Sequence, residues 1–464
     1  MNQDQAISYT LAVLCGDNYE CMRRHIEYGN TEVLHNDQRL VIEPSGFFEK
    51  LYLNTRVSVP ALPLAEIQGV PIIFGRPCVK RNVSQDGIER IFIKADIIAS
   101  AFFLLTRYEE IVRREIRDEH GRFPGRESLP FRAGFLHRPI VDEYGALLRK
   151  WLREVGVEVS EPPPKIKRIF LTHDVDRPWA WRTFRSSVKA TFAKVYRNPV
   201  QAFNPMLCYF GLLYNRDPYD CFDWILEQDT SLRDTYGLEI VESVFFFLAA
   251  GTDPKDRRCY LKDRRIEHLF RRIEHKRGKI GLHSSYSAGK SPERIAVEKG
   301  QLEKAAHVAV RWNRHHYLTS REPEHLAVLE SAGITDDFTM GYADVAGFRL
   351  GTCHPVRWFD PVSLRLTKLT LHPMTIMECT LDHHEYMNLG YVDARRICFD
   401  LLEQVKKHHG EAVLLWHNTR LSGHNRHDYQ KQLYVDILQF LMTKHIERKQ
   451  FQINLTQSNF ETKY

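Results

Sequence analysis

The sequence predicts an α/β protein whose C-terminal part folds as a parallel sheet or barrel. Three observations carry this prediction. Short apolar strands alternate with helical patterns after residue 165, acids and histidines follow several of these strands, and the proline run at Glu161–Pro164 precedes them. Alternating strands and helices are typical of parallel βαβ units, and consecutive prolines continue neither a helix nor a sheet. We therefore expect two domains, at residues 1–160 and 165–464.

Length and composition set the broad class. The chain has 464 residues, more than one ordinary domain, and its 43% hydrophobic residues are enough for buried cores. The net charge of +6, with both signs mixed throughout, gives no basic field of the size that nucleic acid binding needs. Nine scattered cysteines without a C-x-x-C pair favour reduced thiols. We therefore expect a cytoplasmic protein without a signal peptide or membrane span.

Residues 1–160 predict a smaller α/β domain. Strand-like segments stand between turn-rich stretches, at residues 39–42, 71–74 and 91–93. Asp96 is a candidate N-cap for an apolar helix, and another helix is expected over 141–155. The polar cluster Arg107–Glu110 is most simply explained as ion pairs on a helix face, so we expect no metal ligand here.

Residues 165–464 predict the alternation of a parallel fold. Strands are expected from Ile169 and at 243–248, 279–283, 314–318, 412–416 and 451–455. Helices are expected at 181–196, 266–276, 291–310, 391–410 and 433–446.

The stretch Arg168–Asp176 organises this part of the chain. An apolar strand runs directly into Asp174 and Asp176, which share one face if the extended geometry continues. Two carboxylates at the mouth of a buried strand cost desolvation and mutual repulsion, and a bound cation would offset both. The alternative is a strand-end turn in which these side chains accept hydrogen bonds from backbone amides.

Histidines follow three further strands. His283, His316 and His417 each lie at or near the end of an apolar segment. In parallel β/α folds the C-terminal edge of the strands is where sites are built. Ligand-type residues at four strand ends favour a metal site over the turn interpretation.

The order of these motifs resembles the NodB-type polysaccharide deacetylases. Thr172–Asp176 is similar to the family's first motif, and Gly281–Ser287 to its second, of which it keeps the first histidine. Gly347–Thr352 looks like the arginine motif, and Leu414–Asn418 like the last motif. The resemblance covers about residues 165 to 460. It implies a distorted (β/α) barrel, preceded by an accessory region as in a divergent bacterial subgroup.

The resemblance also implies a chemistry. It implies a divalent metal, zinc with cobalt or nickel as alternatives, and a carbohydrate substrate of surface polysaccharide metabolism. Asp174 would be the general base, Asp176 and His283 metal ligands, and His417 the acid that protonates the leaving amine. Arg349 would orient Asp174, or alternatively form a structural salt bridge.

The third metal ligand has to be found elsewhere, because Ser287 stands where the second motif histidine is expected. A neutral hydroxyl is a poor ligand for zinc, which needs three protein ligands and an open position. We expect His316 to supply it. We prefer His316 to His315 because the apolar Leu318 would lie on the same strand face; for either histidine, the alternative is a surface position.

Three functions remain open at this point. The first is a metal-dependent hydrolase that removes an N-acetyl or similar acyl group from a carbohydrate. The second is a non-catalytic relative that binds a glycan or acts as a scaffold, and the third is hydrolysis of a non-sugar C–N bond. The metal content of the purified protein separates the hydrolases from the binding protein.

Overall fold

The structure, a computed structural model, describes most of the chain: residues 3–29, 37–49, 52–53, 58–83, 87–195, 199–213, 216–256, 261, 263–422 and 429–443. The chain divides into two compact units. The first comprises residues 1–167, 317–375 and 401–412, and the second 168–316, 376–400 and 413–464. The predicted linker ends close to the boundary after Lys167, but the first unit also takes in two later segments.

The first unit holds a four-stranded sheet in the order β1-β2-β6-β5. The strands β1 (Ile26–Tyr28), β2 (Leu40–Ile42) and β6 (Glu89–Ala95) are parallel, and β5 (Gly75–Val83) is antiparallel to β6. The predicted strands at 39–42 and 91–93 are therefore confirmed. The prediction at 71–74 overlaps β4 (Val70–Ile72), which pairs with β3 (Ala65–Ile67).

Further strands of the first unit come from its later segments, for which the sequence patterns gave no prediction. They follow the order β12-β13-β11: β12 (Val356–Asp360), β13 (Arg365–Leu371) and β11 (Asp336–Asp337). The strand β12 is antiparallel to β13, and β11 is parallel to it.

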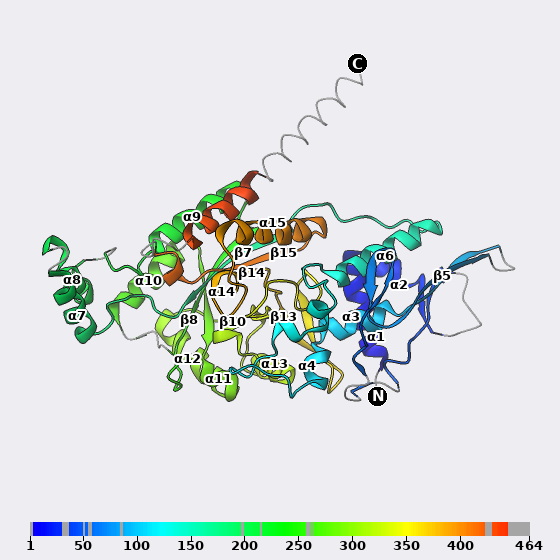
Figure 1. The fold of residues 1–464 in the computed structure, drawn as a ribbon, viewed down its shortest axis with the longest axis horizontal. Coiled ribbons are helices and arrows are strands. Elements are labelled where there is room, and N and C mark those ends of the chain that lie inside the picture. The colour runs from blue at the N-terminus through cyan, green and yellow to red at the C-terminus, as the bar shows by residue number, and fades with distance from the viewer. Residues whose placement is uncertain are drawn as a thin grey trace, which may run out of the picture. The chain divides into compact units, whose positions relative to one another are not determined.

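Helices pack on one another in the first unit (Figure 1). The predicted cap is confirmed, because the Asp96 carboxylate accepts a hydrogen bond from the Ala99 amide at the start of α3. The sequence patterns did not predict α1. The helices of this unit are α1 (Gln3–Cys15), α2 (Tyr19–Arg23), α3 (Ile97–Leu105), α4 (Tyr108–Val112), α5 (Leu129–Arg132), α6 (Ile140–Glu154) and α13 (Leu326–Ser331).

The second unit contains parallel strands in the order β10-β9-β8-β7-β15-β14. They are β7 (Arg168–Val175), β8 (Val241–Phe247), β9 (Lys279–Ser284), β10 (Trp312–His315), β14 (Ile376–Met377) and β15 (Glu411–Leu415). The α/β class is confirmed. Among the described residues β14 pairs only with β15, and a closed barrel is not seen.

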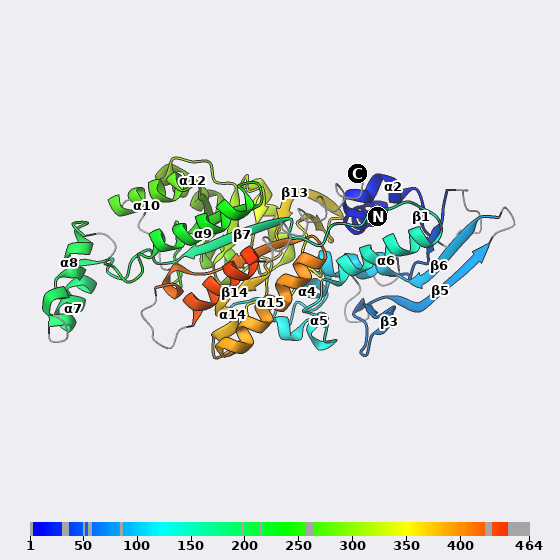
Figure 2. The same ribbon diagram turned by 90° about the horizontal axis from the view of Figure 1, so that it is seen from above.

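Most predicted helices of this part have a counterpart. The helices α9, α10 and α12 pack on β8 and β9 (Figure 2), and residues 430–443 are also helical. No described helix has the length and apolarity that crossing a bilayer requires. The helices are α7 (Phe184–Val195), α8 (Asn204–Tyr209), α9 (Phe222–Tyr236), α10 (Arg264–His275), α11 (Tyr286–Lys290), α12 (Arg294–Ala306), α14 (Glu378–Asp382) and α15 (Tyr391–Lys407).

Two predicted strands have other outcomes. The strand expected over 314–318 ends at His315. His316–Leu318 form a 3-10 turn, in which Tyr317 and Leu318 have positive φ angles of 56° and 54°. The strand expected at 451–455 lies outside the described residues.

A buried ion-pair triad stabilises the first unit. Both Arg107 and Arg349 donate to the Glu110 carboxylate, with Arg107 Nη2 at 2.6 Å and Arg349 Nη2 at 2.8 Å from Oε2. Burial raises the pKa of Glu110, but the two guanidinium groups outweigh it and lower the pKa to about 2. The ion pair predicted within Arg107–Glu110 is therefore present, between Arg107 and Glu110, and it is buried.

Glu110→Gln should destabilise the protein by about 3–5 kcal/mol, because it leaves two buried guanidinium groups without their counter-charge. The measurement is the free energy of unfolding in urea. The matched control is Glu154→Gln in the more exposed Arg81–Glu154 pair, which should cost less than about 1 kcal/mol. Equal losses in both variants would contradict this account of the triad.

Candidate metal centre

Polar side chains converge where the parallel strands of the second unit end. Asp174 and Asp176 come from the end of β7, and His283 from the end of β9. His316 and His417 follow β10 and β15. The sequence prediction that ligand-type residues gather at C-terminal strand ends therefore agrees with the structure.

The strands curl to make this convergence possible. Neighbouring strands lie about 4.8 Å apart, so β7 and β10, separated by β8 and β9, would stand about 14 Å apart in a flat sheet. Yet Arg314 Nη1 on β10 lies 3.0 Å from Asp174 Oδ1 on β7. Curvature across four strands thus brings residues distant in sequence to one point.

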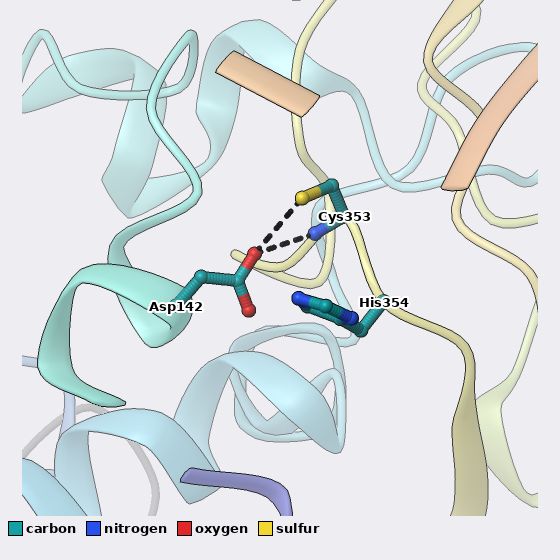
Figure 3. Close-up of side chains that lie close together, drawn as sticks. All are labelled: Asp142, Cys353 and His354. Carbon is teal, nitrogen blue, oxygen red and sulfur yellow. Dashed lines mark hydrogen bonds between the residues drawn. The ribbon is translucent and has the colours of Figure 1, made fainter. Parts of the chain in front are cut away.

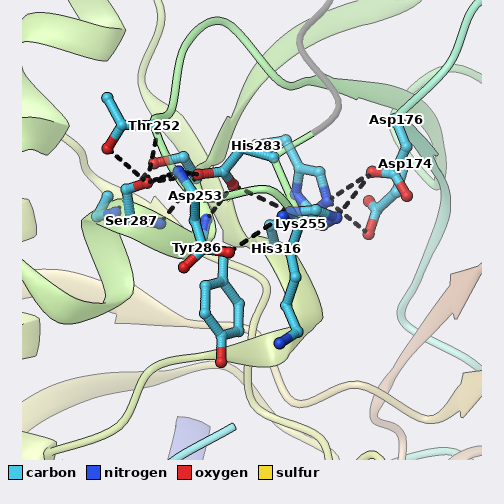
Figure 4. A network of polar contacts seen from close by, with 12 residues as sticks. Asp174, Asp176, Thr252, Asp253, Lys255, His283, Tyr286, Ser287 and His316 are labelled. Carbon is cyan, nitrogen blue, oxygen red and sulfur yellow. Dashed lines mark hydrogen bonds and ion pairs between the residues drawn. The ribbon is translucent and has the colours of Figure 1, made fainter.

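Asp176, His283 and His316 form a cluster with the geometry of a metal site (Figure 4). Asp176 Oδ1 lies 3.3 Å from His283 Nε2 and 3.5 Å from His316 Nε2, and one potential ligand atom of each residue lies within 4.8 Å of the others. Within the described residues, Asp176 Oδ1 and His283 Nε2 are buried without a hydrogen-bond partner. Buried polar atoms are normally satisfied, so a cation that accepts both lone pairs fits here.

The opposite ring nitrogens of both histidines are held by the protein. His283 Nδ1 lies 2.9 Å from the Arg314 carbonyl, and His316 Nδ1 lies 3.4 Å from Asp256 Oδ1. Since those oxygens accept hydrogen bonds, each Nδ1 donates to them and each Nε2 faces Asp176. Burial lowers the pKa of His316, but the Asp176 and Asp256 carboxylates outweigh it and raise the pKa to about 9, so a bound cation would replace the Nε2 proton. Carbonyl and carboxylate partners of this kind orient metal-bound histidines in many sites.

Ser287, which stands where a second motif histidine was expected, has a role of its own. Its hydroxyl donates to Asp256 Oδ2 at 2.5 Å and accepts hydrogen bonds from the Thr252 and Asp253 amides at 2.9 Å. Burial raises the pKa of Asp256, but hydrogen bonds from His316, Ser287 and backbone amides outweigh it and lower the pKa to about 2. Ser287 therefore fixes the carboxylate that orients His316.

Asp174 has an environment different from that of Asp176. Its Oδ1 accepts from Arg314, which also donates to Thr172 Oγ1 at 2.7 Å, and its Oδ2 lies 3.6 Å from His283 Nε2. Burial raises the pKa of Asp174, but His283 and Arg314 outweigh it, so the net pKa is lowered. Asp174 is therefore ionised at neutral pH, with one oxygen held and the other facing the cluster.

His417 lies on another side of the two acids. Its Nδ1 is 2.5 Å from Glu378 Oε1, and its Nε2 is 4.0 Å from Asp174 Oδ2 and 3.9 Å from Asp176 Oδ2. Burial lowers the pKa of His417, but the Glu378 carboxylate outweighs it and raises the pKa well above its usual value. The side chains of Asp176 and His417 are 24% and 17% exposed, so this side of the site is open to a ligand.

The structure corrects two interpretations of the sequence. The arginine that pairs with Asp174 is Arg314, whereas Arg349 binds Glu110; the structural salt bridge is thus the alternative observed for Arg349. The reason for choosing His316 is also wrong, because residues 316–318 form a turn, so His316 and Leu318 do not lie on one face of a strand. His316 lies beside Asp176 all the same, and its role as a ligand stays a prediction.

Sequence reasoning missed three supporting residues. Arg314 could have been found, because it precedes His316 by two positions near the end of a predicted strand, where a buried arginine needs a counter-charge. Glu378 and Asp256 gave no local signal. They lie 39 and 60 residues from the histidines that they orient.

Two other residue groups have metal-like spacing, but their acids and histidines make hydrogen bonds within the protein, and of their atoms Glu378 Oε2 is buried without a partner. In the first unit, Asp142 Oδ2 accepts from the backbone amide and thiol of Cys353 at 2.9 and 3.1 Å (Figure 3). His354 Nε2 lies 2.9 Å from the His408 carbonyl. In the group of Glu378, Cys379 and His417, burial raises the Cys379 pKa to about 11, so its thiol is protonated at neutral pH. Both groups are explained by protein hydrogen bonds.

Comparisons with known proteins add limited information. Residues 3–156 match the model of a family of unknown function (DUF7033). The chain is similar to a solved structure described as "Crystal structure of putative polysaccharide deacetylase from Mycobacterium smegmatis", at 14% identity and a TM-score of 0.36, over 61% of this chain and 86% of that one. Among curated proteins there is no match. A likeness this weak says nothing of activity, so the site itself has to support a function.

His316→Ala should lower zinc affinity by orders of magnitude, because two ligands remain where zinc needs three. Competition against a chromogenic chelator measures the affinity. His354→Ala is the matched control, since it removes a histidine from a group whose atoms are already satisfied, and it should leave the affinity unchanged. Unchanged zinc affinity in His316→Ala would remove His316 from the ligand set.

Asp256→Asn should lower zinc affinity about 10–100-fold, because it weakens the hydrogen bond that orients His316 without removing a ligand. The same competition measures it. Asp253→Asn, at a more exposed neighbouring carboxylate, is the control and should have little effect. A loss equal to that of His316→Ala would instead make Asp256 a ligand.

Proposed function

We propose that this protein is a metal-dependent hydrolase that removes an N-acetyl or similar acyl group from a carbohydrate. The observation that supports this most strongly is the division of roles around one cluster. Asp174 is held ionised by Arg314, and His417 is held protonated by Glu378, with Asp176, His283 and His316 between them. Two titratable groups with pKa values pushed in opposite directions are typical of a base and an acid acting together.

The cluster fits a divalent cation with nitrogen and oxygen ligands, zinc above all. Two histidine nitrogens and one carboxylate oxygen leave a coordination position open for substrate or water. When bound, the cation polarises the acyl carbonyl and lowers the pKa of a water molecule toward neutrality. Cobalt or nickel would suit the same residues.

The chain's own residues would divide the proton transfers. Asp174 Oδ2 takes a proton from the attacking water, because its other oxygen is occupied by Arg314. His417 Nε2 gives a proton to the leaving amine, because its Nδ1 is held by Glu378. Asp176 stays a ligand rather than a base, since its Oδ1 faces both imidazoles.

The resemblance of the sequence motifs to NodB-type deacetylases supports a carbohydrate amide as the substrate. The two other functions left open by the sequence predict different results. A glycan-binding or scaffold protein would hold no metal, and a hydrolase of non-sugar C–N bonds would hold metal but release no acetate from N-acetylated sugars.

Asp174→Asn should keep zinc but lower turnover about 10²–10⁴-fold, because it removes the base and leaves the ligands. Asp176→Ala should lose zinc and activity together. The measurements are metal content and acetate release from N-acetylglucosamine oligosaccharides. Equal zinc loss in both variants would show that the two acids are wrongly assigned.

A further inference from the structure

The segment 177–216 differs from the rest of the chain in charge. The whole sequence contains 65 basic and 59 acidic residues, close to parity. This segment contains no Asp or Glu, and it has seven basic residues: Arg177, Arg182, Arg185, Lys189, Lys194, Arg197 and Arg216. Positive charge is therefore concentrated in one segment of a chain that is otherwise mixed.

The helix α7 in this segment exposes its apolar side. Phe184 and Phe192 are 53% and 68% exposed, and Val195 lies on the same helix face by its spacing. The two residues that α7 buries are Ser187 and Thr191. A helix that only packs on its own protein buries its apolar stripe and exposes the polar side, so α7 presents the reverse of that pattern.

The neighbouring helix α8 repeats this feature. Phe203 and Phe210, which flank α8, are 65% and 60% exposed, and Leu212 is 73% exposed. The two helices pack on each other and lie side by side in both views (Figures 1 and 2), with the rings of Phe184 and Tyr209 6.1 Å apart. Together they expose large apolar side chains that the described part of the chain does not cover.

Basic side chains border the apolar stripe. Arg185 and Lys189 are exposed on α7 at helical positions next to those of Phe184 and Phe192. Long basic side chains in this position extend their charged ends toward lipid phosphates while their stems stay on apolar groups. Aromatic and aliphatic residues beside Lys and Arg, on helices too short to span a bilayer, are typical of helices that lie in the membrane interface.

We propose that α7 and α8 form an interfacial anchor that binds the surface of membranes containing anionic phospholipids. The absence of acidic residues makes the segment complementary to a negative surface, where juxtamembrane Lys and Arg are attracted. A second copy of this chain is a poorer occupant, because the same positive segment would face itself. This inference does not depend on the proposed hydrolysis.

The test is binding of the full-length protein to sedimentable vesicles. Vesicles of phosphatidylcholine with one-third phosphatidylglycerol should bind the protein at low salt, and vesicles of phosphatidylcholine alone should bind it at least about tenfold more weakly. High salt should weaken the binding to anionic vesicles, because it screens the charges. Absence of binding to anionic vesicles at low salt would overturn the proposal.

Two double variants separate charge from apolar insertion. The charge variant, Arg185→Gln with Lys189→Gln, should lower the partition coefficient about 10- to 30-fold. The apolar variant, Phe192→Ser with Phe210→Ser, should lower it about tenfold or more, because it removes the apolar area that would enter the membrane. All four side chains are exposed, so circular dichroism and melting should stay as in the wild type.

Matched controls use exposed residues elsewhere in the second unit. Lys276→Gln with Lys304→Gln changes the net charge equally, and Val392→Ser removes an exposed apolar side chain from another helix. Both controls should bind like the wild type. Equal losses in controls and anchor variants would contradict the proposal. A second contradicting result would be a wild-type dimer in sedimentation velocity that becomes a monomer only in the Phe192→Ser, Phe210→Ser variant. This face would then be a self-association surface.

Discussion

The buried ion pair between Asp174 and Arg314 is the contact on which the candidate site depends. It joins the ends of β7 and β10 across two intervening strands, so it exists only because the sheet curls. The backbone that places this guanidinium also places the Arg314 carbonyl on His283 and leads directly into His316. The short strand β10 therefore holds Asp174, the proposed base, and His283, a candidate ligand. It also leads the chain to His316, the other candidate histidine ligand.

The sequence predicted the parts of the site that are local in the chain. An apolar strand followed by Asp174 and Asp176, and later strands followed by histidines, follow from periodicity and from the rule that parallel folds build sites at one edge. Contacts between distant elements could not be predicted in this way. Arg349 was chosen for its motif, but only the fold shows that its partner is the buried Glu110 of the first unit. The extension of that unit into later segments depends equally on contacts between distant residues.

Ser287 illustrates how the site compensates for a missing ligand. The serine holds Asp256, Asp256 holds the imidazole of His316, and His316 Nε2 faces Asp176. The hydroxyl is thus part of the support for a histidine that follows β10. The two cysteine-containing groups differ from this cluster, because their acids and histidines already have hydrogen-bond partners in the protein. Among the described residues, the candidate centre is distinguished by two unsatisfied buried atoms that face each other, Asp176 Oδ1 and His283 Nε2, whereas the group of Glu378 has one such atom, Glu378 Oε2, beside a protonated thiol.

The central claim is that the residues at the ends of β7, β9 and β10 bind one divalent cation. X-ray absorption at the zinc edge on zinc-loaded, full-length protein tests it most directly, because sulfur and nitrogen ligands differ in bond length, about 2.3 Å against about 2.0–2.1 Å. The account predicts a shell of two imidazole nitrogens and light oxygen or nitrogen ligands, without sulfur. A sulfur ligand would move the metal to a group containing Cys353 or Cys379, and absence of bound zinc would contradict the metal centre altogether.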